Sequence, residues 1–214
     1  MLINENRIKI AVQKRGRLRV PSFDYLNSIG LYFGIGESND LIVSCQNAPV
    51  DVLLVRNRDI PEYVRTGAAD FGIVGLNTLY ERDECYPVTN QFEFGRCSLV
   101  IAASINSGIN SVTKLQNKRI ATSYPNSLRR YLNENGIIAN VIEINGSVEI
   151  APLLNIADAV CDITQTGDTL RKYGLKPLAT ILRSQAVMIE GANRNNVDSF
   201  KEKYIYASSK VKTI

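Results

Sequence analysis

Short apolar segments rich in Val and Ile alternate along this chain with segments of helical pattern, and no other feature constrains the fold as strongly. The segments predicted as strands are Arg7–Val12, Leu41–Cys45, Val50–Val55, Ala69–Val74, Ser98–Ala103, Arg119–Thr122, Asn140–Ile144, Ala159–Ile163 and Ala179–Ile189. Helices are predicted at Pro21–Ile29, Asp59–Arg65 and Ser127–Asn135, because a glycine follows each of them closely. Strands that alternate with helices predict an α/β fold.

The chain of 214 residues contains no histidine. This excludes Ser-His-Asp and Cys-His nucleophile pairs and every metal site with an imidazole ligand. Any chemistry must use carboxylates, Arg, Lys, hydroxyls, backbone N–H groups or a hard metal ion. The four cysteines contain no C-x-x-C pair, so neither a zinc ribbon nor a thioredoxin-type site is indicated.

Charge and apolar content limit the partners. The net charge of +4 mildly favours an anionic ligand, but the basic residues are dispersed and no nucleic-acid-binding motif accompanies them. The apolar stretches fall well short of the ~20 residues of a membrane helix. The apolar run that follows Arg7 is too short for a signal peptide. We therefore expect a cytoplasmic protein with free thiols and with neither nucleic acid nor membrane as a partner.

The strongest motif for chemistry is the segment Asp158–Leu170. An apolar strand that reaches Asp162 leads into a turn rich in threonine around Gly167, and a helix follows. Hydroxyls and backbone N–H groups at a helix amino end suit a phosphate monoester, and the carboxylates Asp158 and Asp162 suit the vicinal diol of a ribose. The simpler alternative is a capped helix with surface threonines.

Two groups of cations follow predicted strands. Lys14, Arg15, Arg17 and Arg19 surround Gly16 directly after the first strand, and Arg56 follows the strand that ends at Val55. The functional interpretation is a clamp for a polyphosphate, since Arg binds phosphate oxygens bidentately. The alternatives are a solvated basic turn and, beside Arg56, an Asp59 that only caps the following helix.

Glycines in the segment Gly67–Gly75 lie where a helix meets a strand and where that strand meets a loop. Close packing explains them, and so does an adenine or ribose that approaches the backbone near Gly75. No P-loop motif is present, which disfavours a P-loop NTPase.

The most plausible seam lies near residues 92–96, where a new strand, helix, strand series begins. If the last strand returned to the first half, the protein would have two α/β lobes with a ligand cleft between them.

Together these motifs coincide with one family. The chain resembles the catalytic subunit of ATP phosphoribosyltransferase from Ile8 to about Ile189. The segments that carry the resemblance are Ala11–Leu18, Arg56 with Asp59–Pro61, Gly67–Gly75, Lys118–Pro125, Gly146–Pro152 and Asp158–Leu170.

The resemblance implies a fold and a reaction. The fold would have two lobes of periplasmic-binding-protein-like (type II) architecture, with residues 1–94 and 177–214 in lobe I on the ATP side and residues 95–176 in lobe II. The reaction would join ATP to phosphoribosyl pyrophosphate (PRPP), giving N1-phosphoribosyl-ATP and pyrophosphate with Mg²⁺. This is the first step of histidine biosynthesis.

The resemblance also assigns roles to residues. PRPP would be bound by Glu149, Asp158, Asp162, Thr164, Gln165, Thr166, Gly167, Asp168 and Thr169. ATP would be bound by Arg17, Arg56, Asp70 and Gly75, and the catalytic cations would be Lys14, Arg17 and Arg56. No protein-built metal site is implied, because substrate phosphates would hold most of the Mg²⁺.

Four residues depart from the family pattern. Asn77 stands where the family more often has an acidic residue, and Asn155 stands where it more often has Gly. Asn39 and Asp40 stand where the family usually has basic residues at the PRPP pyrophosphate. Stabilisation of the leaving group would then fall to Lys14, Arg15 or Arg17.

The length of the chain bears on which regulatory subunit or domain it would work with. Long family members carry a carboxyl-terminal histidine-binding domain, for which 214 residues leave no room, and short members work with a regulatory subunit that resembles histidyl-tRNA synthetase. The chain could be a short form, a lineage that lost the domain, or a truncated long form. A homodimer or higher oligomer is expected.

A different class of function stays open. A two-lobed binding protein or sensor could close on an anion without catalysis. Binding of PRPP, ATP and free amino acids would distinguish the two classes.

Overall fold

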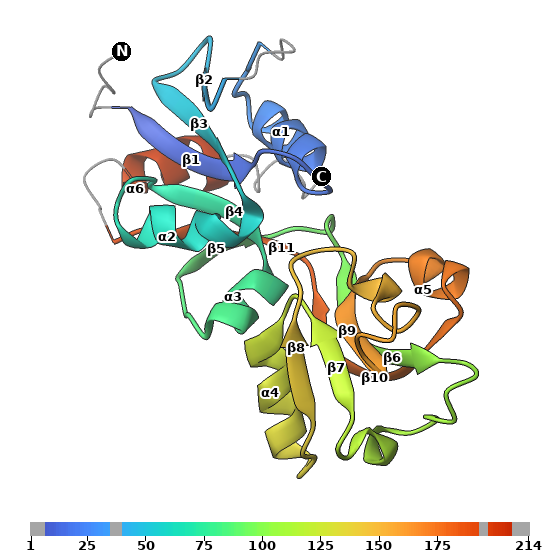
Figure 1. The fold of residues 1–214 in the computed structure, drawn as a ribbon. Helices are drawn as coiled ribbons and strands as arrows, with labels where there is room; N and C mark the ends of the chain where they lie inside the picture. The colour runs from blue at the N-terminus through green and yellow to red at the C-terminus, as the bar shows by residue number, and fades with distance from the viewer. Residues whose placement is uncertain (1–6, 35–39, 193–196, 207–214) are drawn as a thin grey trace, which may run out of the picture. The chain divides into compact units, whose positions relative to one another are not determined.

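The computed structural model describes residues 7–34, 40–192 and 197–206 and divides the chain into two compact units (Figure 1). Unit 1 comprises residues 1–79, 85–95 and 186–214, and unit 2 comprises residues 80–84 and 96–185. The return to the first unit, expected at residue 177, falls inside strand β10 (Leu175–Ser184) and is corrected to residue 186. The reason is that β10 pairs with β6 (Cys97–Ser104) of unit 2 along its whole length.

Unit 1 is built on a six-stranded mixed sheet in the order β2-β3-β1-β4-β11-β5. Its strands are β1 (Ile8–Gln13), β2 (Ile42–Ser44), β3 (Val50–Val55), β4 (Phe71–Gly75), β5 (Val88–Gln91) and β11 (Ala186–Glu190). Its helical segments are α1 (Arg19–Ser28), η1 (Asn57–Asp59), α2 (Ile60–Arg65), the start of α3 (Leu76–Arg82), α6 (Val197–Phe200) and η4 (Lys201–Tyr206). Strand β1 is parallel to β3 and β4, so these three strands end at the same edge of the sheet.

Helices cover both faces of this sheet, which explains why β4 is buried at every position and β3 at every position but its last. Ile10 and Phe71 face a cluster that includes Leu26 of α1 and Phe200 of α6. On the other face, Ala11 and its neighbours pack in a cluster with residues of α2. The strand ends are therefore fixed by a core on each side.

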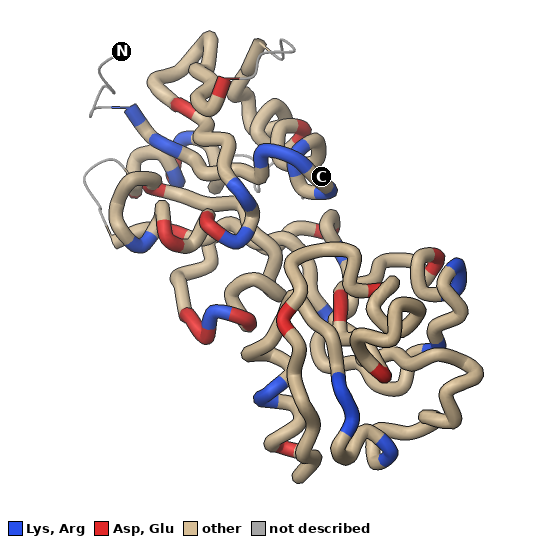
Figure 2. The backbone as a smooth tube through the Cα atoms, viewed as in Figure 1, with Lys and Arg blue, Asp and Glu red and all other residues tan. Residues whose placement is uncertain are grey.

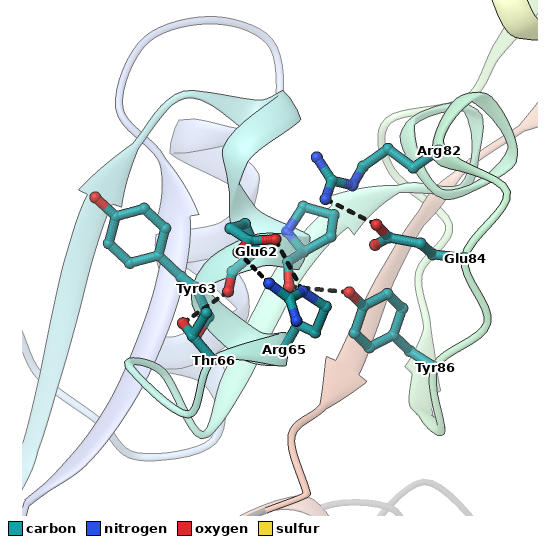
Figure 3. Close-up of polar contacts among 8 residues, drawn as sticks. Glu62, Tyr63, Arg65, Thr66, Arg82, Glu84 and Tyr86 are labelled. Carbon is teal, nitrogen blue, oxygen red and sulfur yellow. Dashed lines mark hydrogen bonds and ion pairs between the residues drawn. The ribbon is translucent and has the colours of Figure 1, made fainter.

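Tyr86, in the segment after α3, contacts α2. In Figure 3 the Tyr86 hydroxyl donates a hydrogen bond of 3.0 Å to the Pro61 carbonyl. On the same helix, Arg65 Nε lies 2.9 Å from a carboxylate oxygen of Glu62. The Tyr86 hydrogen bond connects the segment that leads into β5 to the helix that precedes β4.

Unit 2 has a five-stranded mixed sheet in the order β10-β6-β9-β7-β8. Besides β6 and β10, its elements are η2 (Val112–Leu115), β7 (Arg119–Thr122), α4 (Pro125–Glu134), β8 (Asn140–Glu143), η3 (Val148–Ile150), β9 (Ala159–Thr164) and α5 (Asp168–Lys172). Strand β7 is parallel to β8 and β9. Leu128 and Leu132 of α4 pack in the cluster on one face, and Val148 and Leu170 pack in the cluster on the other.

Most predicted elements are present, and the α/β fold class is confirmed. The predicted strand Ala179–Ile189 is wrong as a single element, because Gln185 separates β10 and β11, which belong to different sheets. Strand β5 was not predicted. Asp59 does not cap α2 through its side chain: the 3₁₀ turn η1 gives it φ −95° and ψ −16° rather than an extended N-cap conformation.

Among the described residues, no helix combines the length and the hydropathy needed to span a membrane.

Candidate functional site

The loop that follows β9 in unit 2 is held by its own side chains. The Thr164 hydroxyl accepts a hydrogen bond of 3.0 Å from the Gly167 N–H, and Gly167 has a left-handed φ of 79°. The Thr166 hydroxyl contacts the Asp168 carboxylate. Gln165, Thr166, Asp168 and Thr169 are exposed, so the loop presents hydroxyls and N–H groups to solvent.

Charges in this loop are already paired. Asp168 forms an ion pair with Arg171, which also donates to the Thr166 carbonyl at 3.1 Å. The hydrogen bond from Thr166 and the one from Arg171 hold the pKa of Asp168 below its ordinary value. Asp168 thus shapes the loop, and Arg171 braces it.

Asp162 lies on β9 just before the loop and is half-buried. One of its carboxylate oxygens accepts the Ile163 N–H at 2.8 Å. Burial raises the pKa of Asp162 to about 6, and repulsion from the Glu149 carboxylate adds to the rise. Asp162 and Glu149 therefore lie close enough for their charges to repel each other.

Asp158 is not brought to the loop. It precedes β9, whose six residues rise about 3.3 Å each, so it lies at the opposite end of the strand from Thr164. Its carboxylate accepts the Arg119 N–H at 2.8 Å and pairs with the Arg119 guanidinium at 3.0 Å, which lowers the pKa of Asp158. The expectation that Asp158 and Asp162 share one ligand is corrected on this geometry.

Sequence reasoning missed Glu81, which caps α4. The Glu81 carboxylate accepts the N–H groups of Asn126 at 2.9 Å and Ser127 at 2.8 Å, and also the Ser127 hydroxyl at 2.6 Å. A carboxylate is stabilising at a helix amino end. No local pattern reveals this contact, because Glu81 precedes Ser127 by 46 residues. The positive end of α4 is occupied by the chain itself.

In unit 1 the basic segment folds directly onto the carboxyl edge of the sheet. The Lys14 N–H donates to the Val55 carbonyl at 2.7 Å, which extends the pairing of β1 with β3. The Gln13 side chain accepts the Leu18 N–H at 3.0 Å and lies under Gly16, whose φ of 119° suits glycine. Arg19 donates to the Lys14 carbonyl at 2.8 Å. Figure 2 shows this segment as a blue run between β1 and α1.

Arg17 and Arg56 both lie at this edge. Arg17 Nη1 donates to the Gly95 carbonyl at 2.6 Å, and Nη2 lies 3.4 Å from Asn77 Oδ1. Arg56 directly follows β3 and is exposed. Neither guanidinium forms an ion pair with a described residue. The edge therefore offers cationic donors that no acid in the described part of the chain neutralises.

Asp70 and Gly75, both expected on the ATP side, lie at opposite ends of β4. Asp70 precedes the strand, and its carboxylate accepts the Lys9 N–H at 2.8 Å. Gly75 ends the strand at the cationic edge. A Cβ on Gly75 would overlap Asn77 Oδ1, so the chain itself requires this glycine.

No group of three or more Cys, Asp or Glu in the described part of the chain could hold a metal ion. Asp40 is exposed beside β2, and Asn39 lies outside the described residues.

Comparisons with known proteins identify the family. Residues 56–210 match the family described as HisG: ATP phosphoribosyltransferase. The chain belongs to this family. It is 43% identical over 190 residues to ATP phosphoribosyltransferase of Maricaulis maris (strain MCS10), covering 86% of this chain and 64% of that relative. The chain thus spans 64% of the length of this curated relative.

Solved structures agree with the fold. The ATP phosphoribosyl transferase (HisG:HisZ) complex from Thermotoga maritima contains a chain with a TM-score of 0.80 and 29% identity, and the match covers 95% of this chain and 99% of that one. A substrate binding protein of an amino acid ABC transporter matches with a TM-score of 0.59 and 14% identity over 97% of this chain and 95% of its own. The expected periplasmic-binding-protein-like (type II) fold is confirmed.

Proposed function

We propose that this member of the HisG family is an ATP phosphoribosyltransferase, which transfers the 5-phosphoribosyl group of PRPP to N1 of ATP and releases pyrophosphate. This would be the first step of histidine biosynthesis. Family membership supports the reaction, and the observation that carries it is the self-braced loop after β9 beside Asp162.

In this proposal unit 2 binds the ribose phosphate. The hydroxyls and N–H groups of the exposed loop hold the 5-phosphate, contributed by Thr164, Gln165, Thr166, Gly167, Asp168 and Thr169. Asp162 and Glu149 accept hydrogen bonds from the ribose hydroxyls. Burial is the main reason that the pKa of Asp162 is raised, and a ligand that donates to both carboxylates would relieve the smaller contribution from their mutual repulsion. Asp158 takes no part, because it is paired with Arg119.

Unit 1 supplies the positive charge. Lys14, Arg17 and Arg56 bind phosphate oxygens of ATP and of the departing pyrophosphate. Adenine N1 already carries an available lone pair, so its attack on the ribose C1 needs no general base, in keeping with a chain without histidine. Stabilising the negative charge that develops on pyrophosphate is an electrostatic task, which fixed guanidinium groups can perform.

Mg²⁺ is usually bound by only one or two carboxylates together with substrate phosphates. We infer that Mg²⁺ arrives with the substrate phosphates. Octahedral Mg²⁺ is commonly bound in this way.

Partners and location follow from the same proposal. A subunit that resembles histidyl-tRNA synthetase is a candidate regulator, since the related structure from Thermotoga maritima is a HisG:HisZ complex. We also propose a homodimer or higher oligomer in the cytoplasm, with ATP and PRPP as its small-molecule partners.

The direct test is the reaction itself. The protein is incubated with ATP, PRPP and Mg²⁺, alone and with a HisZ-type subunit, and the N1-substituted adenine nucleotide is followed by its ultraviolet absorbance. Product formation in either arm supports the proposal. Binding of PRPP without product in both arms would instead indicate a binding protein, and binding of neither substrate would reject both functions.

A further inference from the structure

Arg17 is held in place by two oxygen atoms of its own unit. The Gly95 carbonyl accepts from Nη1 at 2.6 Å, and Asn77 Oδ1 lies 3.4 Å from Nη2. A guanidinium is planar and carries several N–H donors in a fixed arrangement. Anchoring both of its terminal nitrogens fixes the plane of the group and the direction of every remaining donor.

Asn77 is itself fixed by burial and by its neighbours. Only 1% of its surface is exposed, although it is polar and lies at the end of the sheet where ligands are expected. Its side-chain oxygen fills the space that a Cβ on Gly75 would need, and Arg17 Nη2 lies 3.6 Å from that same point. Gly75, Asn77 and Arg17 therefore form one packed set.

The donors that remain on Arg17 have no acceptor among the described residues. Arg17 is half-buried and forms no ion pair in the part of the chain that the structure describes. Arg19, in the same basic segment, differs from Arg17 because it donates a hydrogen bond to the Lys14 carbonyl of its own segment. Arg17 thus combines a fixed orientation with free N–H donors.

We propose that Asn77 is a positioning residue for the ATP and pyrophosphate site, and that it acts by holding the Arg17 guanidinium toward a phosphate oxygen. Gly75 serves the same purpose by leaving room for the Asn77 amide. This inference rests on the proposed function, in which Arg17 binds phosphate. Asn77 would then contact no substrate itself but would determine how well Arg17 binds phosphate.

The experiment compares Asn77→Leu, Asn77→Asp and Gly75→Ala by calorimetry with ATP and with inorganic pyrophosphate. Asn77→Leu removes the side-chain oxygen that accepts from Arg17 and keeps a similar side-chain size. We expect the dissociation constants of this variant for ATP and for pyrophosphate to rise about tenfold, the effect of one lost charge-assisted hydrogen bond. Asp retains an oxygen at the same place and should restore most of the affinity. Gly75→Ala displaces the Asn77 amide and should weaken binding as much as Asn77→Leu does.

The same variants are then made in an Arg17→Met background. If Asn77 acts through Arg17, neither Asn77→Leu nor Gly75→Ala weakens ATP binding further there. An equal loss in both backgrounds would overturn the proposal in favour of a structural role. Wild-type affinity in both Asn77→Leu and Gly75→Ala would overturn it as well. If Asn77→Leu does not fold, the Asn77→Asp and Gly75→Ala measurements decide.

Two controls separate this inference from the proposed function. Asn27→Leu, on α1 of the same unit, should bind ATP like the wild type. Ribose 5-phosphate, a probe for the loop after β9, should bind every variant equally. If the wild-type protein binds neither ATP nor ribose 5-phosphate, the proposed function is rejected. If it binds both, the inference about Asn77 is decided by the Asn77 and Gly75 variants alone.

Discussion

The carboxyl edges of the two sheets differ in how they meet an anion. The edge of unit 1 presents Arg17 and Arg56, neither of them paired with a described acid. The loop of unit 2 has Arg171 beside it, but Arg171 already forms an ion pair with Asp168 and donates a hydrogen bond to the Thr166 carbonyl. The first edge therefore offers cationic donors that no described acid neutralises, and the second offers neutral hydroxyl and N–H donors.

This difference matches the two kinds of phosphate in the proposed reaction. A polyphosphate carries several charges and is bound well by guanidinium groups. A ribose monophosphate needs fewer charges but more directional contacts, including acceptors for its sugar hydroxyls, and Asp162 with Glu149 provides such acceptors. The same strand geometry thus supports two chemistries, because the residues that follow each strand differ.

The largest expected effect comes from removing the oriented cation. Arg17→Met should lower kcat/KM for the forward reaction by about a hundredfold, the range for removing a single charge-stabilising donor. Its thermal midpoint should change little, since the side chain is only half-buried. Steady-state kinetics and thermal melting check this. A variant that melts well below the wild type would show that Arg17 is structural.

A smaller loss is expected on the other edge. Asp162→Asn should weaken ribose 5-phosphate binding about tenfold, because an amide accepts diol hydrogen bonds less strongly than a carboxylate. It should leave pyrophosphate binding unchanged. Calorimetry with both ligands tests the division of labour, and equal loss for the two ligands would contradict it.

The raised pKa of Asp162 predicts that the stability difference between the wild type and Asp162→Asn depends on pH. Burial raises the pKa of Asp162 from 3.8 to about 6, so the folded state holds this proton more tightly than the unfolded state. Its contribution is fully present below pH 3.8 and is lost as the pH rises through about 6. The Asn variant should therefore gain in melting temperature relative to the wild type between pH 5 and pH 7.5. A difference that stays constant over this range would contradict the assignment.

Glu81 should affect stability without affecting the ligands. Glu81→Ala removes the carboxylate that caps α4 and should cost about 1–2 kcal/mol of unfolding free energy. Glu134→Ala, at the other end of the same helix, is the matched control and should be near neutral. Denaturant unfolding gives both values. Equal losses in the two variants would show that the cap contributes nothing special.

The smallest effect is expected for Asp158→Asn. It weakens a partly exposed ion pair with Arg119, which should cost no more than about 1 kcal/mol. Ribose 5-phosphate should still bind with wild-type affinity. A loss of ribose 5-phosphate affinity comparable to that of Asp162→Asn would return Asp158 to the binding site.

The sequence predicts most of the strands and the motifs at their ends, because apolar runs and glycines are local signals. It does not by itself sort residues before a strand from those after it: Asp158 and Asp70 were grouped with motifs at the far end of their strands. Contacts between distant segments, such as Glu81 with Ser127, leave no local trace. At Gly75 the sequence left close packing and a ligand open, and the structure supplies a packing reason, since Asn77 Oδ1 lies where a Cβ would be.

The central claim, that each edge serves one kind of phosphate, is tested most directly by one cross-comparison. Arg56→Met and Thr166→Val are each titrated with inorganic pyrophosphate and with ribose 5-phosphate, by calorimetry under identical salt. We predict that Arg56→Met weakens only pyrophosphate binding and Thr166→Val weakens only ribose 5-phosphate binding. If either variant weakens both ligands to the same extent, the two edges do not divide the substrates as described.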